Sequence, residues 1–96
     1  MVLTAAFAQV LVATTLANMG QVLQAQGSYA RARQCYEESL QIRKAALGDR
    51  HADVAKSLLG LGSVCREEGK YADALVFFEQ ALEIYRATLG DKHVSA

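Results

Sequence analysis

Residues 12–53 read VATTLANMGQVLQAQGSYARARQCYEESLQIRKAALGDRHAD, and residues 54–95 read VAKSLLGLGSVCREEGKYADALVFFEQALEIYRATLGDKHVS. The two segments align without a gap at an offset of 42 residues, and 17 of the 42 pairs are identical. Self-similarity at such a period is typical of folds that stack one supersecondary unit on the next. The duplication therefore predicts a repeat protein whose functional residues lie on a surface rather than in an enclosed pocket.

Length and composition limit the chain to one small domain. It has 96 residues, of which 52% are hydrophobic and 21% are charged, as in a globular protein. Such a chain is too short for a large enzyme core, and it contains no phosphate-loop, dinucleotide or nucleophile-elbow motif. We therefore expect no enzyme activity, no metal site and no cofactor.

The charge distribution gives no electrostatic reason to bind nucleic acid or a membrane. Ten acidic residues balance ten basic ones, and the basic residues are dispersed. The apolar start, Met1 to Ala13, has no basic segment before it and is shorter than the ~20 residues of a membrane span. A cleaved signal and an extension of the first helix both remain open, and we favour the extension.

Cys35 and Cys65 stand at non-equivalent positions of the two segments. A disulfide or metal framework that belonged to the repeat would place its cysteines at equivalent positions, so reduced buried thiols are the simpler interpretation. We accordingly expect a cytosolic or nuclear protein, and we favour the cytoplasm.

Each segment is predicted to form two helices. In the second segment Val54, Leu58, Leu61 and Cys65 recur at helical spacing, and Gly69 ends this pattern as Gly27 does in the first. A second apolar stripe follows each of these glycines and stops at Gly48 or Gly90. Its members are Tyr29, Ala32, Tyr36, Ser39, Leu40, Arg43 and Leu47, and then Tyr71, Ala74, Leu75, Phe78, Ala81, Leu82, Tyr85 and Leu89. The short turns between the helices predict antiparallel hairpins.

Two glycines inside the predicted first helices, Gly20 and Gly62, require a packing reason, because a helical glycine costs about 1 kcal/mol relative to alanine. We expect them to allow close approach to the small residues of the partner helices, Ala32 and Ala74. The larger Tyr36 and Phe78 would then fill the wider end of the interface between the helices.

The linker between the segments runs from Leu47 to Asp53 and contains a Leu-Gly-Asp-x-His sequence that recurs from Leu89. Asp53 is expected in the first turn of the next helix. His51 and His93 occupy equivalent linker positions without a cysteine or carboxylate cluster at ligand spacing. Turn hydrogen bonding is therefore a better interpretation for them than metal binding.

This spacing resembles the tetratricopeptide repeat (TPR), and the long period with its linker is similar to the 42-residue subclass found in kinesin light chains. The resemblance covers Val12 to Ser95. Its signature positions fall on Leu16, Met19, Gly20, Leu23, Ala32, Tyr36 and Ser39, and then on Leu58, Leu61, Gly62, Cys65, Ala74, Phe78 and Ala81. The chain departs from the family where Ala52 and Val94 replace a linker proline, and where Asn18 has no asparagine counterpart in the second segment.

The resemblance implies an all-α solenoid of two helical hairpins, with four antiparallel helices stacked in a right-handed superhelix. Residues 1–11 would be a helical extension, residues 12–53 the first repeat and residues 54–95 the second. The chain would be part of a longer array with neighbouring repeats, or would form a homodimer through its last helix, where Leu75, Val76 and Leu82 leave apolar groups on more than one side.

The resemblance also implies a protein-interaction module, a scaffold or adaptor with a concave face formed by the first helix of each repeat. A peptide or partner helix would contact residues on that face: Thr14, Asn18, Gln21, Gln24, Lys56, Leu59, Ser63 and Arg66. A family-type clamp for a C-terminal carboxylate is not expected, because only Lys56 matches it. Two alternatives remain open: a solvated face that binds nothing, and a structural spacer or self-association segment of a larger signalling or motor-associated protein.

Overall fold

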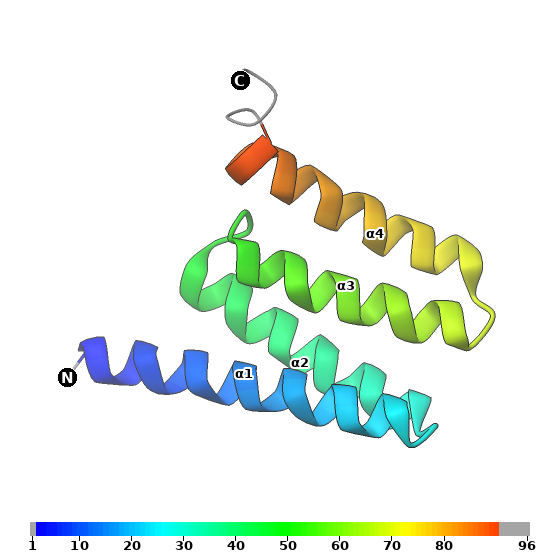
Figure 1. The fold of residues 1–96 in the computed structure, drawn as a ribbon. Coiled ribbons are helices and arrows are strands. Elements are labelled where there is room, and N and C mark those ends of the chain that lie inside the picture. Colours follow the sequence, from blue (N-terminus) through cyan, green and yellow to red (C-terminus); the bar gives the residue numbers. More distant parts are fainter. Residues whose placement is uncertain (1, 91–96) are drawn as a thin grey trace.

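The computed structural model describes residues 2–90, and these form a stack of antiparallel helices (Figure 1). The helices are α1 (Val2–Ala25), α2 (Tyr29–Leu47), α3 (Ala52–Glu67) and α4 (Tyr71–Tyr85), followed by one π-helical turn, η1 (Arg86–Gly90). Helix α2 packs on both α1 and α3, and α3 packs on α4. The predicted all-α fold of two stacked hairpins is therefore confirmed.

The turns within the hairpins have the geometry that their glycines predict. Gly27 and Gly69 both adopt φ of +82°, a left-handed conformation that glycine takes without steric cost. In the first turn the amide of Ser28 donates to the carbonyl of Leu23 at 2.8 Å, and the amide of Gly27 donates to that of Gln24 at 3.0 Å. These bonds satisfy carbonyls at the helix end and reverse the chain.

His51 is the N-cap of α3. Its Nδ1 accepts a hydrogen bond from the amide of Asp53 at 3.0 Å, while Asp53 lies in the first helical turn. An amide at a helix start has no partner within the helix, so the imidazole satisfies it. Both linker predictions are confirmed here; His93 lies outside the described residues.

Helix α3 forms the centre of the core because α2 and α4 cover it from two sides. One buried cluster joins Val54, Ala55 and Leu58 to Ala81 and Ile84 of α4, and Leu40 of α2 packs against it. A second cluster joins α3 residues to Ala32 and Tyr36 of α2. The hairpins thus share one core across the α2–α3 interface.

The close contact predicted at each of the two glycines is confirmed, but the predicted partner residue is wrong. The atoms nearest to a Cβ built on Gly20 belong to the ring of Tyr36, and those nearest to one on Gly62 belong to the ring of Phe78. The expected contacts with Ala32 and Ala74 are not the closest ones. Glycine is needed because an aromatic ring of the partner helix contacts its backbone, and any Cβ at the position would be too close to that ring.

The N-terminal region is helical from Val2, so it does extend the first helix. Side chains 5–9 of this extension are exposed. The uncharged run is also longer than Met1 to Ala13: by length and by its mean hydropathy of 1.3, the segment Ala5–Ala25 could cross a membrane. The expectation that the segment is too short to span is therefore wrong on length. Buried core helices of soluble proteins and signal sequences near the N-terminus meet the same two criteria; only 11% of this segment is buried, although α1 packs along α2.

The end of the second hairpin differs slightly from the prediction. The α-helix ends at Tyr85, and the backbone continues in π-helical geometry to Gly90, the last described residue. The predicted stop at Gly90 therefore includes a wider last turn. Nothing in the described contacts explains the change in helix type.

Candidate functional site

A groove of about 530 Å³ opens between α1 and α3, with α2 beneath it. Its lining residues are Thr14, Ala17, Asn18, Gln21 and Gln24 of α1, Tyr36 and Arg43 of α2, and Lys56, Leu59, Gly60 and Ser63 of α3. The first helix of each hairpin therefore supplies one wall of the groove, while the second helix of the first hairpin supplies the floor.

Seven of the eight side chains predicted to face a ligand line this groove. The exception is Arg66, which is exposed on the last turn of α3 but is not part of the lining. The seven lining residues are separated by up to 49 positions in the sequence, from Thr14 to Ser63, and the stacking of the hairpins brings them together.

The floor is formed by Tyr36, which is only 3% exposed. Its ring lies between two glycines, Gly20 of α1 and Gly60 of α3. Its hydroxyl donates to Oε1 of Gln24 at 3.0 Å. Burial, and then the negative charge of Glu67, raises the pKa of Tyr36 above 10.0, which keeps this hydroxyl a hydrogen-bond donor.

Gln24 ties the two walls together at one end of the groove. Its Nε2 donates to Oγ of Ser63 at 2.7 Å and to Oε1 of Glu67 at 3.0 Å. Since its Oε1 accepts from Tyr36, this one amide joins α1, α2 and α3. The Glu67 carboxylate therefore lies beside this end of the groove, although Glu67 is not one of the lining residues.

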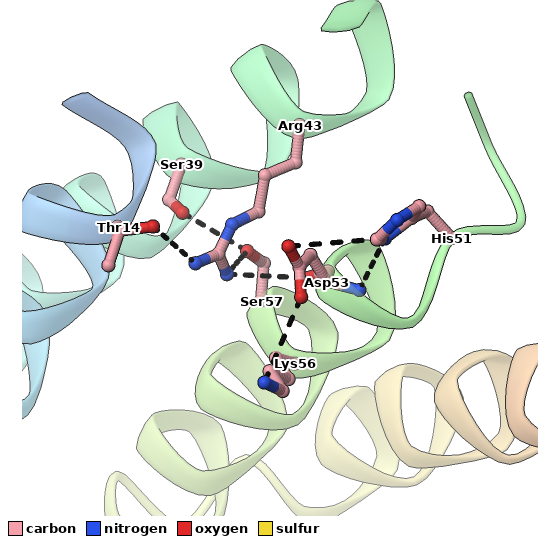
Figure 2. Close-up of polar contacts among 7 residues, drawn as sticks. All are labelled: Thr14, Ser39, Arg43, His51, Asp53, Lys56 and Ser57. Carbon is pink, nitrogen blue, oxygen red and sulfur yellow. Dashed lines mark hydrogen bonds and ion pairs between the residues drawn. The ribbon is translucent and has the colours of Figure 1, made fainter. Parts of the chain in front are cut away.

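The opposite end contains a buried arginine, Arg43 (Figure 2). Its Nη1 donates to Oγ of Ser57 at 3.0 Å and to the carbonyl oxygen of Asp53 at 3.2 Å. Its Nη2 lies 3.4 Å from Oγ1 of Thr14. The guanidinium thus lies where α1, α2 and α3 meet.

Two buried hydroxyls support this arginine. Oγ of Ser39 donates to the carbonyl of Ala13 at 2.8 Å and lies 3.1 Å from Oγ of Ser57. Because Ser39 has used its proton, Ser57 donates to Ser39 and accepts from Arg43. The network is specific to this junction: in the second segment Ala81 and Tyr85 replace Ser39 and Arg43.

Sequence reasoning missed Tyr36, Arg43 and Gly60 as groove residues. The first two were placed in the core-facing stripe of α2, and both are indeed buried. A buried residue can also form the floor of a groove, and the sequence pattern does not distinguish the two positions. A charged residue within an apolar stripe was the available signal for Arg43.

Neither cysteine is in a disulfide: Cys65 is buried and Cys35 is half-buried. Burial raises the pKa of the Cys65 thiol above 9.0, so it remains protonated at neutral pH. Among residues 2–90, no three His, Cys, Asp or Glu side chains come together as a metal site would require.

The groove is suited to hydrogen bonding with a polypeptide. Asn18 and Gln21 offer amide donors and acceptors, and Thr14 and Ser63 offer hydroxyls, whereas the amide of Gln24 is already bonded within the chain. Leu59 adds an apolar side chain that is 38% exposed. This mixture can contact both the main chain and the side chains of a bound segment.

Comparison with known proteins agrees with the architecture. No curated protein matches the chain. The family model described as tetratricopeptide repeat matches residues 11–87, which covers α2, α3 and α4 in full and most of α1. With its duplicated hairpins and this match over most of its length, the chain belongs to the tetratricopeptide repeat family.

Proposed function

We propose that this chain is a scaffold or adaptor module that holds a peptide or helix of a partner protein in the groove between α1 and α3. Tetratricopeptide repeats generally mediate protein–protein interactions and are typically not catalytic. The observation that carries the proposal is the gathering of polar, outward-facing side chains from two separate repeats along one open groove.

Two finer assignments belong to this proposal. The 42-residue period and the Leu-Gly-Asp-x-His linker favour the kinesin light chain-like subclass. The unpaired cysteines, Cys35 and Cys65, favour a reducing compartment such as the cytoplasm.

A peptide selection tests the proposed function. Twelve-residue random peptides displayed on phage are selected on the immobilised chain, and the enriched sequences are synthesised and measured by fluorescence polarisation. Removing both amides in Asn18→Ala/Gln21→Ala should weaken binding about thirtyfold, because two lost hydrogen bonds of about 1 kcal/mol each amount to about 2 kcal/mol.

The matched control removes two amides elsewhere. Gln34 and Gln41 are exposed on α2 and do not line the groove. Gln34→Ala/Gln41→Ala should leave the affinity unchanged. Selected peptides that tolerate the groove variant, or a selection that enriches no binding peptide, would show that the groove is not the binding site.

A structural role is the second candidate, and a comparison of the two repeats favours it. Val22 on α1 is 56% exposed, whereas its counterpart Val64 on α3 is fully buried beside α2. Val12 and Met19 show the same contrast with Val54 and Leu61. Helix α4 also exposes Leu75, Val76 and Leu82. Exposed apolar faces of this kind are typical of interaction surfaces.

Such faces suit a spacer that stacks on neighbouring repeats, or a chain that associates with itself through α4. Sedimentation velocity at micromolar concentration distinguishes self-association. A dimer that is abolished by Leu75→Ser/Leu82→Ser would support it, while a folded monomer across that range would exclude it.

A further inference from the structure

The charged side chains of the groove are unevenly distributed. Both charged residues that line it, Arg43 and Lys56, are basic, and both lie toward the start of α3. Lys56 forms an ion pair with Asp53, whose carboxylate lies 3.8 Å from Nζ of Lys56. Glu67 lies at the opposite end, bonded to Gln24. The lining is therefore basic at one end, and the Glu67 carboxylate, which is not part of the lining, lies beside the other end.

Of the two cations, Arg43 is the one without a carboxylate to balance its charge among the described residues. It is 5% exposed, yet its recorded hydrogen bonds all go to neutral oxygens, and within residues 2–90 no carboxylate is recorded in an ion pair with it. Its Nε has no hydrogen-bond partner. A guanidinium has five N–H donors, and only three bonds are recorded for this one. A buried charge without a counter-ion is costly, and a nearby carboxylate would reduce that cost.

We propose that the Arg43 end of the groove binds the carboxylate of an aspartate or glutamate side chain in the partner segment. This inference rests on the proposed function, because it assumes that the groove holds a polypeptide. Lys56, whose side chain is 65% exposed, supplies a second positive charge at the rim, and Thr14 contributes a hydroxyl beside the guanidinium.

The same charges orient the bound segment. An acidic residue placed near Glu67 would be repelled, and one placed near Arg43 and Lys56 would be attracted. The groove should therefore prefer segments with an acidic residue at the Arg43 end and neutral or basic residues at the Glu67 end.

Arg43 also joins the two hairpins, so loss of binding on its replacement would not separate recognition from folding. A direct test leaves the chain intact and titrates ¹⁵N-labelled protein with N-acetyl-aspartate amide, with N-acetyl-asparagine amide as the isosteric neutral control. Only the aspartate derivative should shift the Arg43 Nε–H signal and the amide signals of Thr14 and Lys56.

N-acetylglycine, which carries a terminal carboxylate, separates the two sources of this group and should bind more weakly. Lys56→Met should weaken binding of the aspartate derivative at least threefold, while Arg66→Met, on the same helix but outside the groove, should not. Equal shifts with the asparagine derivative, or shifts centred away from Arg43, would overturn the inference. So would tighter binding of N-acetylglycine or no effect of Lys56→Met.

The selected peptides distinguish the two proposals. Replacing their acidic residues by the corresponding amides should weaken binding at least fivefold. If this change has no effect but Asn18→Ala/Gln21→Ala does, the groove binds peptides and the carboxylate inference is wrong. If neither change has an effect, both proposals are wrong.

Discussion

The ring of Tyr36 lies against the backbone of Gly60, a residue of the other repeat. A Cβ built on Gly60 would lie 2.5 Å from Cε1 of the ring, and one built on Gly20, across the ring in the first repeat, would lie 3.0 Å from the same atom. The tyrosine is thus held between glycines of two different hairpins. This contact sets how closely α2 approaches α1 and α3.

Gly60→Ala should therefore destabilise the fold. The added methyl group leaves Tyr36 little room to move, because the ring also lies close to Gly20 and its hydroxyl is bonded to Gln24. Overpacking costs about 1–3 kcal/mol, whereas alanine stabilises a helix by about 1 kcal/mol relative to glycine. We expect a net loss of about 1 kcal/mol in the free energy of unfolding, measured by urea denaturation. Gly20→Ala should cost less, and the reverse order would contradict this packing.

Ser39→Ala should cost about 1 kcal/mol, because it removes the hydrogen bond to the buried carbonyl of Ala13 and leaves Ser57 without an acceptor. Ser28 provides a matched control: it is the N-cap residue of α2, but its side chain makes no capping hydrogen bond. Ser28→Ala should change the midpoint of urea denaturation very little. Equal effects of the two substitutions would argue against the buried network.

The ion pair between Arg33 of α2 and Glu68 at the end of α3 should stabilise the junction between the repeats modestly. Nη2 of Arg33 lies 3.0 and 3.1 Å from the two carboxylate oxygens. Since both side chains are partly exposed, we expect a coupling of about 0.5–1 kcal/mol. A double-mutant cycle with Arg33→Met and Glu68→Gln measures it, and the coupling should decrease in 1 M salt. A coupling near zero at low salt would show that this pair does not hold the repeats together.

Stability should decrease at alkaline pH. The pKa values of Cys65 and Tyr36 are both raised in the folded chain, from 9.0 and 10.0, with burial as the main cause. The folded state therefore keeps protons that the unfolded chain releases. The stabilisation from these two groups is complete below about pH 9, and it is lost as the pH rises through their pKa values in the folded chain.

Tyr36→Phe isolates the tyrosine contribution. The variant should be less stable than the original chain at pH 7, because it loses the bond to Gln24. The difference between the two should shrink above pH 10, because only the original chain has this phenol to ionise. Chemical denaturation at a series of pH values gives both curves, and parallel curves would contradict a raised pKa.

Much of the architecture could be predicted because its signals are local. The 42-residue offset, the apolar spacings and the glycines after each first helix predicted two antiparallel hairpins. Seven of the eight proposed contact residues also lie together on the groove. Their helical register follows from the period of 3.6 residues, and the duplication places the two helices side by side.

Other features depend on where separate helices meet. The glycine at position 20 predicted a close contact, but not that its partner would be Tyr36 rather than Ala32. Arg66 has a suitable residue type and helix, yet it lies outside the groove lining. A small rotation of a helix about its axis decides which residue contacts Gly20 and whether Arg66 faces the groove. Side-chain packing across three helices sets that rotation.

Periodicity along the chain was thus sufficient for the helices, their turns and the hairpin pairing, because each depends on residues a few positions apart. The groove, with its basic end and the Glu67 carboxylate beside the other end, arises only when the hairpins stack. Thr14, Arg43 and Ser57 come from three helices, and their hydrogen bonds exist only because packing of the apolar core brings these helices together. Such contacts follow from the distances between helices, which no local sequence pattern encodes.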